Sequence, residues 1–202
     1  NISLNKIVYV NRISISGNTR TQDEVIRREI GISEGGLYSR SALRNSVLKL
    51  RRLGYFSDVQ VSATEIEGMP DKIDLSFVVE ETKTGAVSFS VSHSNNYGIS
   101  VGAGIQEKNI FGSGNTLNAE FKLSESFNKL SFYFENPYFN DENHSISYGA
   151  FMSEINDDDA MQDSYEISTK GVSLGYGIPL TENTRLNSNI EYAKNDLTCG
   201  TA

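Results

Sequence analysis

From residue 85 to residue 195 the chain alternates apolar residues with small or polar ones, segment after segment. In one such segment Leu117 and Phe121 share the odd-numbered positions, whereas Asn118 and Glu120 occupy the even-numbered ones. A period of two residues places these two sets on opposite faces of a β-strand. Soluble sandwiches also alternate, but they seldom do so over seven segments with so little charge on the apolar side. The pattern therefore predicts outer-membrane barrel strands, which face lipid on one side and a wet lumen on the other.

Seven segments carry this alternation, and we predict that their apolar positions form one lipid-facing surface. The predicted set, in chain order, is Val87, Phe89, Val91, Ile99, Val101, Ala103, Ile105, Leu117, Ala119, Phe121, Leu123, Leu130, Phe132, Phe134, Ile146, Tyr148, Ala150, Met152, Val172, Leu174, Tyr176, Ile178, Leu186, Ser188, Ile190 and Tyr192. Only Ser188 in this set is neither apolar nor a tyrosine, and none of its members is charged. A Lys or Arg at the bilayer midplane costs about 2–4 kcal/mol, so this absence of charge fits lipid exposure.

The connections between the segments predict a meander with alternating ends. One end would hold the turns at residues 95–96, 124–128 and 153–164, and the other those at residues 109–115, 136–143 and 179–184. Finished bacterial barrels have an even number of strands. Seven strands therefore predict an incomplete barrel in this chain.

The first 84 residues predict a different kind of domain, with the order strand, helix, helix, strand, strand. Residues 7–16 alternate as a strand. Thr21 then fits a helix N-cap that forms a capping box with Glu24, and Gly31 would end that helix. The second helix would begin at Ser39 or Ser41.

The apolar residues of this second helix recur at helical spacing, and two strands follow it. Leu43, Val47, Leu50 and Leu53 lie four and three residues apart, which predicts one buried stripe. Gly54 suits the left-handed residue after a helix. Strands are predicted at residues 59–66 and 73–81, with a turn at residues 68–71.

Charge and aromatic content change abruptly between the two parts. Residues 1–84 have a formal charge of +1 and residues 85–202 a charge of −9, while 15 of the 20 Phe and Tyr residues follow Gly85. We therefore predict two domains, at residues 1–84 and 85–202. The acidic second part argues against a nucleic-acid partner, which would need a basic surface.

The distribution of reactive side chains predicts no enzyme, cofactor or metal site. His93 and His144 would lie at opposite ends of the barrel strands, so they cannot share a metal ion or a nucleophile. The acidic run Asp157-Asp158-Asp159 is explained more simply as a hydrated loop than as a cation site. Cys199 is the only cysteine and has no partner for an internal disulfide.

Several short motifs in the first domain resemble the POTRA domain that adjoins the barrel in the BamA family of the POTRA–barrel superfamily. They are Val8-Tyr9-Val10, Ile15-Ser16-Gly17-Asn18, Arg27-Arg28-Glu29 and Arg52-Leu53-Gly54-Tyr55-Phe56. In the second domain, Asn109-Ile110-Phe111-Gly112-Ser113-Gly114 and Asn136-Pro137-Tyr138-Phe139 resemble two inner turns of the same family. The resemblance implies an α+β POTRA domain followed by an antiparallel, all-β transmembrane barrel segment.

The same resemblance implies a function and a location. Members of the BamA family insert β-barrel proteins into the bacterial outer membrane, with the barrel in that membrane and the POTRA domains in the periplasm. The implied partners are unfolded outer-membrane proteins, the lipoproteins of the BAM complex, and outer-membrane lipids including lipopolysaccharide. The alternative is a POTRA–barrel secretion transporter that exports a soluble partner protein through its lumen.

Three groups of residues are candidate binding sites. The first is the opening barrel strand, which in this family meets the last strand at a weak seam where a client strand pairs: Val87, Ser88, Phe89, Ser90, Val91 and Ser92. The second is a POTRA edge strand, which could receive an extended chain: Val59, Gln60, Val61 and Ser62. The third matches the positions that contact a lipoprotein partner in BamA-like proteins: Arg27, Arg28 and Glu34. The simpler explanations are lumen-facing serines, an ordinary sheet edge and a charged helix surface.

Overall fold

A computed structural model describes residues 7–94, 98–157, 165–181 and 184–199. The chain divides into two compact units, the first formed by residues 1–84 with 111–113 and the second by residues 85–110 with 114–202. In the described part of the chain, no helix has the length and apolar content needed to cross a membrane.

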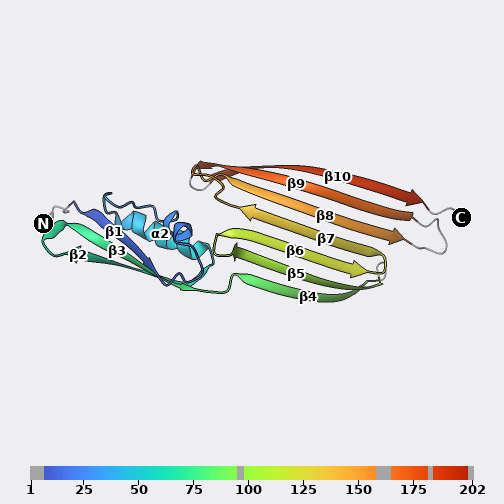
Figure 1. Ribbon diagram of the computed structural model, residues 1–202, viewed down its shortest axis with the longest axis horizontal. Coiled ribbons are helices and arrows are strands. Elements are labelled where there is room, and N and C mark those ends of the chain that lie inside the picture. The colour runs from blue at the N-terminus through green and yellow to red at the C-terminus, as the bar shows by residue number, and fades with distance from the viewer. Residues whose placement is uncertain (1–6, 95–97, 158–164, 182–183, 200–202) are drawn as a thin grey trace. The chain divides into compact units, whose positions relative to one another are not determined.

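The first unit contains three strands and two helices in the predicted order. Its elements are β1 (Tyr9–Ser16), α1 (Asp23–Arg27), α2 (Arg40–Arg52), β2 (Phe56–Ile66) and β3 (Met69–Glu81) (Figure 1). The strand order is β1-β3-β2, with β1 parallel and β2 antiparallel to β3. The predicted β-α-α-β-β fold is therefore confirmed.

The core of the first unit is built entirely from its own residues. The buried apolar side chains that the structure describes all lie between Val10 and Val79, with Phe77, Leu75 and Leu50 completely inaccessible. From α2, Leu43 and Val47 pack against this core, as the stripe predicted. The unit thus has the self-contained core that an independent domain needs.

The start of α2 follows the sequence prediction, whereas α1 departs from it. Ser39 is the N-cap of α2 and its Oγ accepts a hydrogen bond from the Ala42 N–H at 3.3 Å. Gly54, just beyond α2, has a φ of 71°, as the left-handed position requires. The capping box at Thr21 is wrong, because α1 is a five-residue helix whose N-cap is Gln22, without a side-chain cap.

The carboxylate of Glu81 binds the loop that precedes α1. It accepts hydrogen bonds from the backbone N–H groups of Thr19, Arg20 and Thr21 at 3.0, 3.0 and 2.6 Å, and from the Thr19 hydroxyl at 2.8 Å. A residue 60 positions away thus satisfies the backbone donors that precede α1. A short sequence pattern cannot reveal this partner, because Glu81 lies at the end of β3, far from the loop in sequence.

The β2–β3 hairpin turns earlier than predicted. Residues 69–71 belong to β3, and the turn consists of Glu67 and Gly68 between Ile66 and Met69. Gly68 has a φ of 83°, which supplies the positive φ that a two-residue hairpin turn needs. The tighter turn is possible because Pro70 lies at the beginning of a strand, where no ladder donor is lost.

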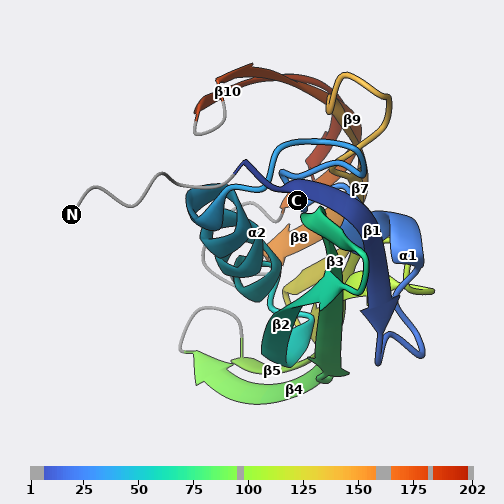
Figure 2. The same cartoon turned by 90° about the vertical axis from the view of Figure 1, so that its left-hand side faces the viewer.

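The second unit is one antiparallel sheet of seven strands. They are β4 (Gly85–Ser94), β5 (Gly98–Ile110), β6 (Asn115–Ser124), β7 (Phe127–Asn136), β8 (Ser145–Asp157), β9 (Tyr165–Thr181) and β10 (Thr184–Cys199). Each strand pairs with its neighbours in sequence, so the order runs from β4 to β10 without a crossover. Figure 2 looks along the strands and shows the sheet curving from β4 round to β10 as an open trough.

The strand register places the residues of the predicted lipid-facing set on one face of the sheet. One row of directly paired residues crosses five strands as Ala119, Phe132, Ala150, Val172 and Tyr192. The parallel row below it is Leu117, Phe134, Tyr148, Leu174 and Ile190. Because a slip of one residue would reverse the faces, these rows could form only in the observed register.

Asparagine side chains close the two turns whose motifs resemble the BamA family. Asn109 Oδ1 accepts a hydrogen bond from the Gly114 N–H at 2.7 Å, and Asn109 is 8% exposed. Asn136 Oδ1 accepts one from the Tyr138 N–H at 3.0 Å. Phe111, next to Gly112 in the first turn, has a φ of 53°, an uncommon conformation for a bulky residue. Asn and Gly recur in these motifs because the turns need a side-chain acceptor and positive φ.

The last two strands are longer than predicted. β9 has 17 residues and β10 has 16, and Pro179 lies inside β9 instead of in the following turn. About 9–11 residues suffice for a strand to cross a bilayer, so both strands extend beyond its apolar layer. The predicted turn at residues 95–96, and Asp158 and Asp159 of the acidic run, fall outside the described residues.

The Glu81 network predicts a pH-dependent contribution to the stability of the first unit. Partial burial opposes ionisation, but hydrogen bonds from Thr21, Thr19 and Arg20 outweigh it and lower the pKa of Glu81 from 4.5 to about 2. A lowered pKa stabilises the fold above the unfolded-state value, and this stabilisation is lost as the pH falls through 4.5 towards about 2. We expect Glu81→Gln to reduce the free energy of unfolding by about 1–2 kcal/mol at pH 7.

Urea unfolding of a fragment comprising residues 1–84, from pH 7 to pH 2.5, would measure this effect. The difference between Glu81→Gln and the wild type should shrink steadily below pH 4.5. Glu80→Gln is the matched control, because Glu80 is exposed and the charge change is the same. A difference that stays constant over the whole pH range would mean that the Glu81 charge does not stabilise the unit.

Candidate functional site: the β4 edge and the polar trough

β4 forms one edge of the seven-stranded sheet and pairs only with β5 in the described structure. Its outward backbone N–H and C=O groups therefore face no neighbouring strand there. Its apolar side chains are open, as on the other edge strand: Phe89 is 82% and Val91 78% exposed, and Ile190 and Tyr192 of β10 are 72% and 70% exposed. Such an edge can accept another strand through backbone hydrogen bonds.

The predicted seam serines of β4 lie against glycines of β5. Ser88 pairs with Gly104 and Ser90 with Gly102. Their hydroxyl oxygens lie within 2.9 and 2.8 Å of the positions that a Cβ on these glycines would occupy. Ser88 Oγ lies 3.5 Å from the Gly104 carbonyl, and Ser92 Oγ lies 2.6 Å from Ser100 Oγ. The serine side chains thus lie over the glycines of β5.

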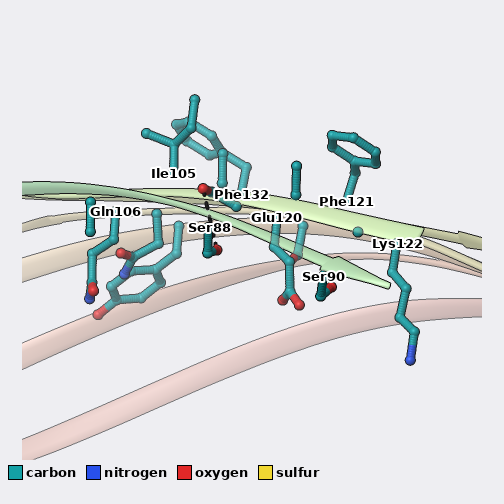
Figure 3. A pocket seen from close by; sticks show the side chains of 16 residues that line it. Ser88, Ser90, Ile105, Gln106, Glu120, Phe121, Lys122 and Phe132 are labelled. Atoms are coloured by element: carbon teal, nitrogen blue, oxygen red, sulfur yellow. Dashed lines mark hydrogen bonds between the residues drawn. The ribbon is translucent and has the colours of Figure 1, made fainter. Parts of the chain in front are cut away.

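Beyond β5 the polar face continues as a shallow concavity of about 340 Å³ lined by β4 to β7. Figure 3 shows Phe121 and Phe132 projecting from one side of the sheet, and Ser88, Glu120 and Lys122 from the other. The described residues of the chain contain no group of three or more His, Cys, Asp or Glu placed to hold a metal ion.

The polar side chains of this concavity contact neighbouring residues on the same face of the sheet. Glu120 forms an ion pair with Lys129 at 3.7 Å, and the Tyr133 hydroxyl donates a hydrogen bond to Glu135 at 3.1 Å. Lys122 lies 6.0 Å from the centre of the Phe127 ring. These contacts are typical of a hydrated, polar lumen surface.

β2 contains the residues of the predicted edge strand, and side chains occupy the backbone groups of its first part. β2 lies at one edge of the three-stranded sheet, with Val59 buried and Gln60 exposed. The Val59 carbonyl accepts a hydrogen bond from Arg51 at 3.1 Å, and the Val59 N–H donates to Asp58 at 2.8 Å. The edge available to an extended chain therefore begins at Val61 and Ser62.

Of the three predicted lipoprotein-contact residues near the end of α1, Arg27 and Glu34 lie close to each other. Arg27 binds Asp23 at 2.9 Å and lies 3.9 Å from Glu34. Glu34 also accepts a hydrogen bond from the Ile13 N–H at 2.8 Å, which joins this group to β1. Arg28 is half-buried and therefore offers less of its surface than Arg27.

The two histidines lie at opposite ends of the strands, as predicted. His93 is the second-to-last residue of β4, whereas His144 precedes β8 at the other end of the sheet. His144 Nδ1 lies 2.6 Å from the Tyr176 hydroxyl and His144 Nε2 lies 3.4 Å from Glu142. These contacts brace the turn between β7 and β8.

Sequence reasoning missed three features of these sites. They are the serine–glycine pairing under β4, the covering of Val59 by Arg51 and Asp58, and an apolar groove on the lipid-facing side between β7 and β10. Each joins residues from different elements. Only the alternation of serine in β4 with glycine in β5 was visible as a pattern.

Comparison with known proteins identifies both units. Residues 8–82 match the POTRA family, described as a surface antigen variable number repeat, and residues 109–200 match the Omp85 superfamily domain. The chain is 33% identical over 182 residues to the outer membrane protein assembly factor BamA of Neisseria meningitidis, covering 89% of this chain and 23% of that protein. BamA of Nitratidesulfovibrio vulgaris is 32% identical over 87% of this chain and 21% of its own length. The chain thus spans about a quarter of the curated relatives it matches.

Solved structures give the same result for the fold. The crystal structure of BamA from Haemophilus ducreyi lacking POTRA domains 1–3 aligns with a TM-score of 0.78 at 26% identity, covering 95% of this chain and 36% of that one. CdiB from Acinetobacter baumannii aligns with a TM-score of 0.63 at 14% identity over 96% of this chain and 39% of that one, which shows a shared fold alone.

Neighbouring positions on β7 provide a test of the two faces. Phe132 lies in a lipid-facing row, and Ser131 projects to the polar face between the same two strands. In the full-length protein, Phe132→Lys should destabilise the folded barrel in phospholipid vesicles by about 2–4 kcal/mol, measured by urea titration of the folded fraction.

The matched control is Ser131→Lys, which adds the same charge to the same strand and should change the stability little. Equal destabilisation by both variants would contradict the assignment of the faces.

Proposed function

The chain belongs to the Omp85 superfamily of POTRA–barrel proteins, and we propose that it forms part of an assembly factor that folds β-barrel proteins into the bacterial outer membrane. The barrel strands lie in that membrane and the POTRA domain lies in the periplasm. We assign residues 1–84 to the POTRA domain that adjoins the barrel and residues 85–202 to the first seven barrel strands. The BamA relatives, which carry the name of outer membrane protein assembly factors, support the proposal.

The observation that carries the proposal is the edge position of β4. Val87, Phe89 and Val91 lie on the predicted lipid-facing side, Ser88 and Ser90 lie over the glycines of β5, and the outward backbone row of β4 pairs with no strand in the described structure. Backbone hydrogen bonding does not depend on the client's side chains. An edge of this kind can therefore template strands of many different sequences.

The free energy for insertion would come from the client. Each unsatisfied backbone group in the hydrocarbon layer costs several kcal/mol, so a client strand gains by pairing with β4 before it pairs with its own neighbours. Burial of the client's apolar face in lipid adds to this gain. The mechanism therefore requires no catalytic group and no nucleotide hydrolysis.

The POTRA unit would supply two further contacts in this proposal. The open end of the β2 edge, at Val61 and Ser62, would receive an extended client segment. Arg27, Arg28 and Glu34 would contact a lipoprotein of the assembly machine. The mixed charges of Arg27 and Glu34 would contribute mainly to the register and rate of docking.

Disulfide crosslinking in cells tests the templating role. In the full-length protein with Cys199→Ser, single cysteines would replace Ser88, Ser90 and Ser92, and a stalled client barrel would carry cysteines in its last strand. We expect crosslinks in one fixed register, because disulfides form only between Cα atoms about 4.4–6.8 Å apart. The yield should exceed that of the control by about fivefold or more.

The matched control is Ser147→Cys. Ser147 lies on the same polar face, but its strand β8 is paired at both edges, with Glu135 and Gly175 opposite Ser147. Equal yields from Ser90→Cys and Ser147→Cys would contradict templating. Crosslinks of a secreted soluble protein to Glu120→Cys in the lumen, without client crosslinks at β4, would support a secretion transporter instead.

A further inference from the structure

A groove on the lipid-facing side of the sheet lies far from β4 and takes no part in strand templating. It is an open depression of about 570 Å³ that spans β7 to β10. The lining residues are almost all apolar, among them Leu130, Phe132, Met152, Val172 and Tyr192.

The groove lies where a small residue, Ala150, stands between bulky neighbours in its row. Ala150 pairs with Phe132 on one side and with Val172 on the other, and Tyr192 follows Val172. The short side chain of Ala150 forms the floor between these larger neighbours. The depression spans β7 to β10 on the lipid-facing side.

Two lysines lie at one end of the groove. Lys170 and Lys194 are directly paired across β9 and β10, and Met152 pairs with Lys170 on the other side. Both lysines are exposed. They come near the beginning of β9 and the end of β10, at the end of the sheet opposite to that at which β4 starts. For a chain with a periplasmic POTRA domain, this end is the outer one.

The lysine pair marks the level at which this surface changes from apolar to polar. The next row outward holds Glu154, Ser168 and Asp196 in place of apolar residues. Asp196 forms an ion pair with Lys194 at 2.9 Å, which partly offsets the positive potential of Lys194. Long lysine side chains at such a boundary place their ammonium groups among the lipid headgroups.

The succession of groups matches the order of groups in a phosphate-bearing lipid. The apolar groove would contact acyl chains, and the two lysine ammonium groups would bind the phosphate. The acidic row lies about 7 Å further out and would contact the cationic part of a headgroup or its counterions. We propose that this groove, floored by Ala150 and ended by Lys170 and Lys194, binds a phosphate-bearing lipid of the outer leaflet. Neither a second copy of the chain nor a client strand would require this sequence of charges.

The test compares two photoactivatable lipids on the full-length protein in phosphatidylcholine vesicles. One probe is a phosphatidylethanolamine and the other a diacylglycerol, each with the same diazirine-bearing acyl chain. In the wild type, peptides from β8 to β10 should be labelled by the phosphatidylethanolamine about fivefold more than by the diacylglycerol, as expected for ammonium–phosphate attraction. Equal labelling by both probes would overturn the proposal, because it would show an unselective lipid surface.

Variants separate the two parts of the site. Lys170→Gln together with Lys194→Gln should abolish the preference for the phosphate-bearing probe, whereas Lys122→Gln with Lys129→Gln, on the opposite face, should not. Ala150→Leu should fill the groove and reduce labelling by both probes, and Ala119→Leu in the same row should not. Unchanged labelling in the double lysine variant would overturn the role of Lys170 and Lys194. Unchanged labelling in Ala150→Leu would overturn the role of the groove.

The result is independent of the templating proposal. Client crosslinking at Ser88 and Ser90 reports on β4, while lipid labelling reports on β8 to β10, so either can fail alone.

Discussion

The requirement that every backbone N–H and C=O inside a bilayer be paired governs the larger part of this chain. In the described residues between 85 and 199 it favours long, adjacent antiparallel strands, of which β4 and β10 form the two edges. Once the strands are paired, the two-residue period decides the rest: lipid-facing rows such as that of Phe132 and Val172 form on one side and a polar trough forms on the other. The candidate site at β4 is thus a direct consequence of the constraint that builds the sheet.

Serine–glycine pairs recur on the polar side of the sheet. Ser88 and Ser90 lie over glycines of β5, and Ser145 and Ser147 lie over Gly177 and Gly175 in the same way. A side chain on these glycines would collide with the serine hydroxyl or displace it. Glycines within strands also allow a sheet to bend, which is consistent with the curvature of the trough in Figure 2. Packing on this face therefore depends on pairs of residues and not on single positions.

The first unit follows different rules, because water can satisfy its exposed backbone. Its stability rests on a small apolar core around Phe77 and Leu75 and on polar contacts between distant segments. Glu81 satisfies the donors before α1, and Arg51 and Asp58 occupy the backbone of Val59 at the sheet edge. The second of these contacts shortens the edge that is open to a partner, a form of protection common at exposed strand edges.

The sequence by itself determined the order of the elements, the two faces of the barrel strands, the α2 stripe and the Asn–Gly turns, because each depends on residues close together in the chain. The lipid-facing set could be assigned residue by residue, since a period of two leaves only two choices. Tertiary structure alone decided that Glu81 binds the loop before α1, that serines lie over glycines, and that Lys170 and Lys194 stand side by side at the end of a groove. These features join residues from separate elements, and only the folded register determines which of them meet.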